Sequence, residues 1–181
     1  MKKALALTAL GLMLVAASAL AQSFGPTGTT QLSVAVAAEA QIEINTATTS
    51  FSTSSSFADY TGTTNLTYKI RTSKTAGTGT GSIVVQITSD FAPTGGPTVG
   101  GTQLTSSDTP TYVCSASSPA TACSGSVTPS TTSSTSVYGF GADNHSAKAG
   151  NTGSVTWTVP NDPLYPTGTY LATATFTISA T

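Results

Sequence analysis

The sequence predicts an all-β protein on the strength of two observations. Apolar residues recur at every second position in segments such as 65–71, 83–87 and 155–159, and stretches rich in Gly, Pro and Ser separate these segments. A period of two residues turns one face of each segment toward a core, as in a β-strand. No stretch beyond the N-terminus shows the apolar spacing and caps of an amphipathic helix. About seven or more short strands joined by such turns predict an antiparallel immunoglobulin-like β-sandwich.

Residues 1–21 have the pattern of a bacterial secretory signal peptide. Two lysines precede an apolar run, and Ala-Leu-Ala at 19–21 supplies the small residues of a cleavage site. Cleavage is therefore expected between Ala21 and Gln22. A membrane anchor is disfavoured because the run is short for a span and no stop-transfer pattern follows it. The sequence thus predicts a secreted protein that meets the membrane only during export.

The first strand of the exported chain is unusually long. The segment QLSVAVAAEAQIEIN, residues 31–45, has an apolar residue at every even position. At roughly 3.3 Å per residue, its thirteen alternating residues would extend about 43 Å, twice the usual strand length. Three interpretations compete. In the first, one strand bends near Ala37 and Ala38 and crosses from one sheet to the other. In the second, the segment forms a hairpin, which the lack of a turn residue disfavours. In the third, the first half of the segment pairs with another copy of the chain.

The third interpretation divides the segment by function. Residues 42 and 44 would then belong to the domain's own sheet, while an N-terminal extension, residues 22–38, would supply a donor strand to a neighbouring subunit. The β-sandwich domain would span residues 39–181. The interface side chains would be the apolar ones on one face of the extension, namely Leu32, Val34, Val36 and Ala38.

The later strands are predicted from the same alternation. Segments 65–73 and 82–91 are expected to form a hairpin across the turn TAGTGTG, and shorter strands are expected at 111–115, 135–140 and 153–159. A final strand covers 169–179. The side chains predicted to point inward are Leu66, Tyr68, Ile70, Ile83, Val85, Ile87, Val155, Trp157, Val159, Tyr170, Ala172, Ala174, Phe176 and Ile178.

Composition excludes two classes of partner. Beyond residue 21 the chain has four cationic and seven acidic side chains, so no basic surface is expected for nucleic acid or an anionic membrane. Ser and Thr make up 60 of those 160 residues. Many of the Thr residues alternate with Val, Ile, Tyr and Phe, which suits the solvent face of a strand. A polar surface with little charge also leaves little repulsion between copies of the same molecule.

The two cysteines, Cys114 and Cys123, predict one structural disulfide. An exported protein meets an oxidising compartment, and a single pair allows one intramolecular bridge. A metal or redox pair is disfavoured because there is no Cys-x-x-Cys spacing and the chain has one histidine. The bridge would close a small loop that contains Pro119.

The sequence offers no pattern typical of catalysis, so the protein is not expected to be an enzyme or to bind a cofactor or metal. Asp143 and His145 lie in one loop, but no Gly-x-Ser-x-Gly elbow accompanies them. Glu39 and Glu43 would share a strand face about 13 Å apart, outside the glycosidase range. A calcium site between loops is disfavoured because no EF-hand spacing supports it; its ligands would be Asp143, Asn144, Asn151, Asn161 and Asp162.

The layout resembles secreted bacterial pilus or fimbrial subunits. The features that carry this resemblance are the signal peptide, the alternating N-terminal segment 31–45 and the Thr-rich sandwich. The resemblance implies a filament subunit that polymerises by donor-strand exchange. It implies copies of the same chain as the main partner, and a host or environmental surface as a second one. The alternative is a monomeric secreted module that binds a carbohydrate or surface ligand through a loop aromatic such as Tyr165.

Overall fold

The computed structural model describes residues 27–105 and 108–181. The predicted signal peptide and its cleavage site at Ala21 and Gln22 therefore lie outside the described residues. The chain divides into two units, residues 1–35 and 36–181. The described residues of the first unit, 27–35, are exposed and belong to no strand.

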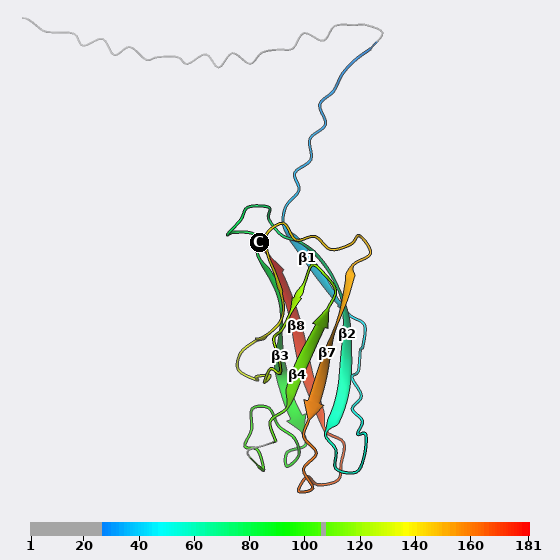
Figure 1. Cartoon of the computed structure of the whole chain (residues 1–181), viewed down its shortest axis with the longest axis vertical. Coiled ribbons are helices and arrows are strands. Elements are labelled where there is room, and N and C mark those ends of the chain that lie inside the picture. Colours follow the sequence, from blue (N-terminus) through cyan, green and yellow to red (C-terminus); the bar gives the residue numbers. More distant parts are fainter. Residues whose placement is uncertain (1–26, 106–107) are drawn as a thin grey trace, which may run out of the picture. The chain divides into compact units, whose positions relative to one another are not determined.

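The second unit contains eight strands and, among its described residues, no helix (Figure 1). The all-β prediction is confirmed. In chain order the strands are β1 (Glu39–Ile44), β2 (Tyr60–Arg71), β3 (Gly81–Ala92), β4 (Thr111–Ala116), β5 (Thr121–Ala122), β6 (Thr135–Phe140), β7 (Asn151–Val159) and β8 (Leu171–Ala180).

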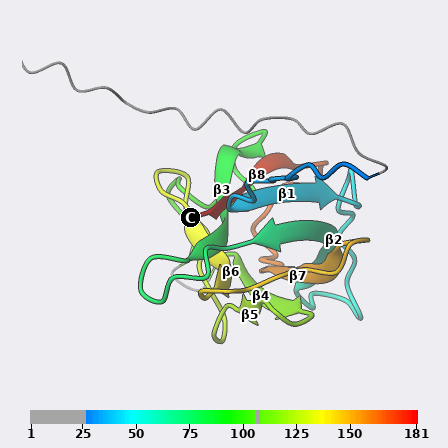
Figure 2. The same cartoon turned by 90° about the horizontal axis from the view of Figure 1, so that it is seen from above.

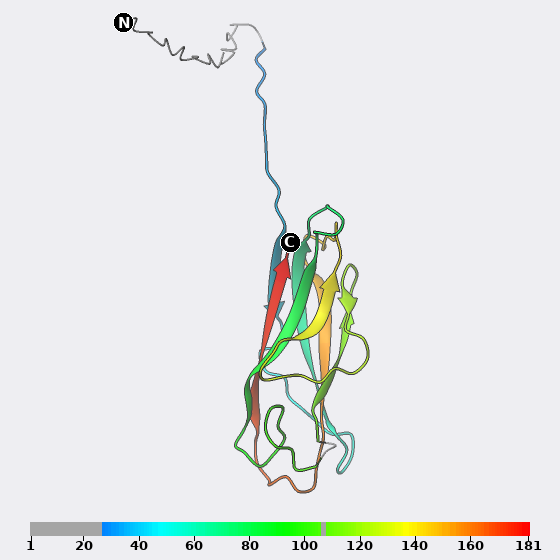
Figure 3. The same cartoon turned by 90° about the vertical axis from the view of Figure 1, so that its left-hand side faces the viewer.

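The strands form two antiparallel sheets of four strands each, arranged as a sandwich. The first sheet has the order β1-β2-β7-β4, and the second has the order β5-β6-β3-β8. Figures 2 and 3 show the two layers, with β1 and β8 beside each other along one side of the sandwich. β1 and β8 contact each other without being hydrogen-bonded neighbours.

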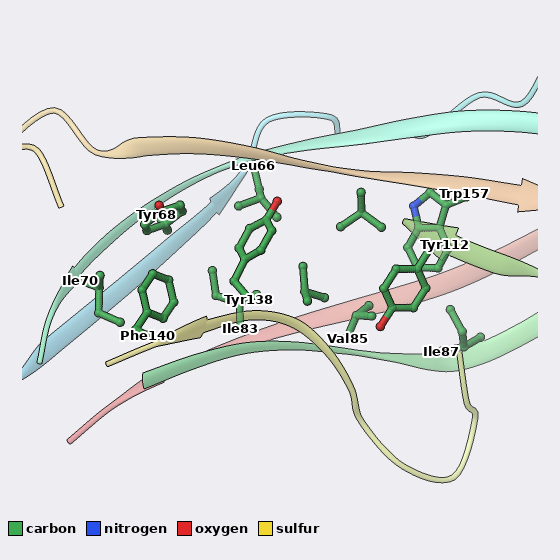
Figure 4. Packing of buried hydrophobic residues seen from close by; sticks show 12 residues of the cluster. Leu66, Tyr68, Ile70, Ile83, Val85, Ile87, Tyr112, Tyr138, Phe140 and Trp157 are labelled. Atoms are coloured by element: carbon green, nitrogen blue, oxygen red, sulfur yellow. The ribbon is translucent and has the colours of Figure 1, made fainter. Parts of the chain in front are cut away.

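Most of the side chains predicted to point inward form the core between the sheets. The inward residues of β2, β3 and β7 are at most 7% exposed, as the alternation predicts. Figure 4 shows Tyr68 and Phe140 packed at one end of the core and Tyr112 against Trp157 at the other. The Trp157 indole N–H donates a buried hydrogen bond of 2.9 Å to the Thr64 hydroxyl. Burial of the tryptophan therefore leaves its polar atom satisfied.

Threonine and serine side chains occupy the outer faces of the strands and form hydrogen bonds across them. Hydroxyl pairs link Ser82 to Ser179 at 3.2 Å and Thr88 to Thr175 at 2.9 Å between β3 and β8. Cross-strand hydroxyl pairs of this kind stabilise a sheet modestly without adding charge. The abundance of Ser and Thr thus belongs to a folded surface rather than to disorder.

The predicted hairpin between segments 65–73 and 82–91 is wrong. Both segments are strands, but β2 lies in the first sheet between β1 and β7, and β3 lies in the second sheet between β6 and β8. The connection at 72–80 carries the chain from one sheet to the other. The Ser73 N–H donates to the carbonyl of Thr181, beyond the end of β8. Alternation predicted the buried face of each strand but did not define its neighbour.

Candidate assembly interface

The long N-terminal strand is shorter in the structure than the sequence predicts. Only Glu39–Ile44 forms β1, whereas residues 31–38 belong to no strand. The pairing register gives the physical reason. Glu39 lies opposite Arg71, the last residue of β2, so residues before Glu39 have no partner strand to pair with. The interpretation of one bent strand that crosses between the sheets is therefore wrong, because β1 pairs with β2 alone.

The apolar side chains of the extension are exposed. Leu32 is 90% exposed, Val34 is 85% exposed and Val36 is 64% exposed, and Ala38 is exposed as well. They occur at alternate positions in a stretch without a charged residue between 22 and 38. Three large apolar side chains in such a row are a surface that water solvates poorly.

Arg71 holds the chain where the extension meets β1. Its Nε donates a 2.7 Å hydrogen bond to the carbonyl of Ala37, and its guanidinium lies 3.1 Å from the carboxylate of Glu39. Both side chains are substantially exposed, at 41% and 79%, so this ion pair contributes little stability. Its geometric effect is to fix the backbone at Ala37, next to the first strand residue.

The predicted disulfide is confirmed. Cys114 and Cys123 are bonded, with their Cα atoms 5.5 Å apart. Cys114 lies in β4 at the edge of the first sheet, and Cys123 directly follows β5 at the edge of the second. The bridge therefore joins the two sheets along the side opposite β1 and β8.

The four sheet edges differ in how they are protected. β1 has two acidic residues, Glu39 and Glu43, within six positions. At the edge of β4, the backbone of Tyr112 exchanges hydrogen bonds of 2.9 and 2.8 Å with Val127. β5 has two residues and ends at the disulfide. By contrast, β8 has ten residues without a charge or a proline.

The free edge of β8 also exposes residues that the alternation assigns to the core. Ala174 lies opposite buried Ile87 and hence faces the same side of the sheet, yet Ala174 is exposed. Leu171 is 69% exposed, and Phe176 and Ile178 are half-buried. Beyond Ile44 the chain leaves the β1 ladder and pairs with β2 again at Ser52, opposite Thr61.

Of the acidic and histidine side chains considered above, His145 and Glu39 line one open surface depression, whereas Asp143 and Glu43 do not. His145 Nε2 lies 3.0 Å from Asp143 Oδ1, and both side chains are more than half exposed. Glu39 and Glu43 lie on the exposed face of β1. Tyr165 was predicted to be the exposed loop aromatic, but its hydroxyl oxygen is buried. Burial and the nearby carboxylate of Asp108 raise the pKa of Tyr165 to about 12. The residue as a whole is half-buried, so the prediction that it is exposed is only partly met.

The side chains weighed for calcium are divided between structural roles. Asn144 accepts a hydrogen bond from the Gly141 N–H, and Asn151 accepts one from the Ala147 N–H. Asp162 accepts one from the Leu164 N–H. Among the described residues, no group of three or more His, Cys, Asp or Glu side chains could hold a metal ion.

Two features of this interface escaped the sequence prediction. The first is the open edge of β8. Its sequence LATATFTISA indicates an unprotected edge, because its ten residues include no charged residue or proline and three of its inward side chains are alanines. The second is Arg71, which was predicted only to point outward. Arg71 and Ala37 are 34 positions apart in the sequence, so their contact depends on the pairing of β1 with β2. The alternation of apolar residues does not predict which strands pair.

Comparison with known proteins found no matching family model, and no curated protein or solved structure matched the chain. Within residues 27–105 and 108–181, no helix has the length and apolar character needed to span a membrane.

Proposed function

We propose that this chain is a structural subunit of an extracellular bacterial filament, in which the N-terminal extension of one copy inserts as a strand into the next. The observation that carries the proposal is the exposure of Leu32, Val34 and Val36 at alternate positions of an uncharged segment. A strand presents alternate side chains to one face, so a single pairing event would bury all three together. Secretion through the predicted signal peptide is part of this proposal.

Burial of the three side chains favours association. Transfer of a Val or Leu side chain from water to an apolar contact contributes roughly 1.5–3 kcal/mol. Three such side chains contribute roughly 5–9 kcal/mol before the cost of ordering the segment is subtracted. Main-chain hydrogen bonds to the recipient strand would add specificity for an extended segment. The absence of charge between residues 22 and 38 removes the usual barrier to such pairing.

The free edge of β8 is the recipient that fits this extension best. It is the one sheet edge of the described residues that is long, uncharged and open. Its exposed small residue Ala174 leaves space on the inward face for a larger side chain from the incoming strand. Pairing there would also cover half-buried Phe176 and Ile178.

The sheet order supports an immunoglobulin-like arrangement with an open position beside β8. In immunoglobulin constant-type sandwiches the strands order as ABED in one sheet and CFG in the other. The order β1-β2-β7-β4 corresponds to ABED if β7 is taken as strand E, and the neighbours β3 and β8 then correspond to C and F. The place of strand G is the free edge of β8, next to β1. We infer that a strand from another copy fills it.

The donor and recipient belong to different copies because the extension cannot easily turn back on its own domain. Residues 31–38 contain no Gly, Pro, Asn or Asp, the residues that favour tight reversals. Arg71 also fixes the backbone at Ala37. A contact between the extension of one copy and β8 of the next uses two different surfaces. Such head-to-tail contacts generate an open filament rather than a closed dimer.

Gel electrophoresis of the mature protein from its producing cells tests the proposal. A ladder of multimers in SDS that collapses on heating is expected, because strand-inserted contacts resist detergent until the sandwich unfolds. Val34→Asp should abolish the ladder while leaving the fold intact, since Val34 is exposed in the free chain. A single monomer band from the wild-type protein, heated or not, would contradict the proposal.

A pair of variants in β8 tests the recipient edge. Ala174→Glu should abolish the ladder, because the charge is solvated in the free subunit but would be buried under an inserted strand. Thr173→Glu is the matched control, since Thr173 is the adjacent exposed residue on the opposite face of β8. If Val34→Asp removes the ladder but Ala174→Glu does not, the extension donates a strand to another edge.

A further inference from the structure

Most of the cationic side chains of the exported chain gather in one surface depression. After residue 21 the sequence has four Lys and Arg residues, and three of them, Lys69, Arg71 and Lys148, line a depression of about 350 Å³. His145, the one histidine of the chain, lines it too. We propose that this depression binds an acidic polysaccharide, that is, a sugar polymer that carries carboxylate or sulfate groups.

The fold assembles this cluster from two segments far apart in sequence. Lys69 and Arg71 are two residues apart on β2 and therefore share its outer face. The loop that carries His145 and Lys148 is attached to the same strand by hydrogen bonds at Ile70. The Ile70 N–H donates to the Ser146 hydroxyl at 2.9 Å, and the Ser146 N–H donates to the Ile70 carbonyl at 2.9 Å. The cluster is therefore held by backbone geometry and does not depend on flexible side chains meeting by chance.

The charge of the depression remains available to a ligand. Among the described residues, the ion pairs are Arg71 with Glu39 and His145 with Asp143, so neither Lys69 nor Lys148 is paired with a carboxylate. Glu39 is the one acidic residue that lines the depression. The permanent charges are three cations, Lys69, Arg71 and Lys148, against the carboxylate of Glu39 and that of Asp143 beside His145. This region therefore has one net positive charge (three minus two), although the exported chain as a whole is acidic.

Several features favour an acidic polysaccharide over other anions. The depression lies on the outer face of a sheet edge, and the amide of Gln41 and the hydroxyl of Ser146, which can hydrogen-bond sugar hydroxyls, also line it. No aromatic side chain lines it, so it lacks the stacking surface with which proteins hold single-stranded nucleic acid. A single patch of this size would bind weakly through screened surface charges. A filament would repeat the patch in every subunit, and a polymeric ligand would then gain affinity by multivalency.

Affinity electrophoresis of the mature protein tests this site. The probes are sodium alginate, a polyuronate, and dextran sulfate, with uncharged dextran as the control polymer. Retardation by both anionic polymers at low salt is expected, with loss of retardation at high salt because the charges are screened. The double variant Lys69→Gln/Lys148→Gln should bind roughly three- to tenfold more weakly, as expected for two exposed charge contacts. The ladder in SDS should be unchanged in this variant.

The fourth cationic residue provides the matched control. Lys74 lies in the connection between β2 and β3, outside the depression, so Lys74→Gln removes one positive charge elsewhere and compares with each single variant, Lys69→Gln or Lys148→Gln. The proposal is overturned if Lys74→Gln weakens binding as much as either single variant, which would indicate general charge attraction. It is also overturned if the double variant binds like the wild type, or if neither anionic polymer retards the protein. These outcomes are independent of the proposed assembly, which the ladder reports separately.

Discussion

The substitution Val34→Ala separates assembly from folding, because Val34 is 85% exposed in the free chain. The change removes two methyl groups at about 0.8 kcal/mol each when buried. Scaled by the exposed fraction, the loss at the interface is about 1.4 kcal/mol, which is roughly a tenfold weaker association. The free energy of unfolding of the single subunit should stay within about 0.5 kcal/mol of the wild type, as for other surface substitutions.

The same substitution at Val155 is the matched comparison. Val155 lies in β7 with no exposed surface, so Val155→Ala should destabilise the fold by about 2–3 kcal/mol. Sedimentation velocity over a concentration series, after heat dissociation and refolding, measures the assembly midpoint. Thermal unfolding of the dissociated protein measures subunit stability. The reasoning is refuted if Val34→Ala leaves the assembly midpoint unchanged, or if it lowers the subunit melting temperature as much as Val155→Ala does.

Three further predictions concern stability. Replacement of Cys114 and Cys123 by Ser should lower the free energy of unfolding by about 2–3 kcal/mol, the value expected for a disulfide loop of this length. Urea denaturation measures the change, and an unchanged midpoint would contradict the prediction. Burial raises the pKa of Tyr138 to about 12, so its neutral form is favoured in the fold. The corresponding stability is complete below about pH 10 and is lost as pH rises toward 12. The part of the absorbance change at 295 nm that Tyr138→Phe removes should appear together with the loss of circular dichroism. Its appearance near pH 10 with an intact fold would count against this. Burial raises the pKa of Asp90, but hydrogen bonds from the Thr98 hydroxyl and three backbone N–H groups outweigh that effect and lower it. Asp90→Asn should therefore lower the free energy of unfolding by roughly 1–3 kcal/mol at neutral pH, and by less as the pH falls through the lowered pKa. Thermal unfolding at several pH values measures this difference, and a difference that does not change with pH would contradict the prediction.

The buried face of each strand was predictable from the sequence because it depends on local alternation. Leu66 and Tyr68 in β2, and Val155 and Trp157 in β7, are buried in the phase that the sequence predicts. The pairing of strands was harder to predict from the sequence, because the alternation within one strand does not specify which other strand lies next to it. β2 and β3 have suitable patterns and a short connection for a hairpin, yet they belong to opposite sheets.

The exposure of individual residues depends on what the opposing sheet provides, which a single strand does not encode. Ala174 has the phase of a core residue and lies opposite buried Ile87, yet it remains exposed on the edge strand β8. Tyr165 lies between prolines in a loop, yet its hydroxyl is buried near Asp108, far away in the sequence. The cationic depression likewise depends on the approach of residues 69–71 to residues 145–148.

The disulfide between Cys114 and Cys123 also determines how the two sheets can separate. It is a covalent link between β4 and the end of β5, whereas β1 and β8 on the opposite side share no backbone hydrogen bonds. The bridge therefore limits how far the two sheets can move apart at the β4 and β5 edges. Between β1 and β8 themselves, the sheets are joined by contacts without a covalent bond or a strand ladder.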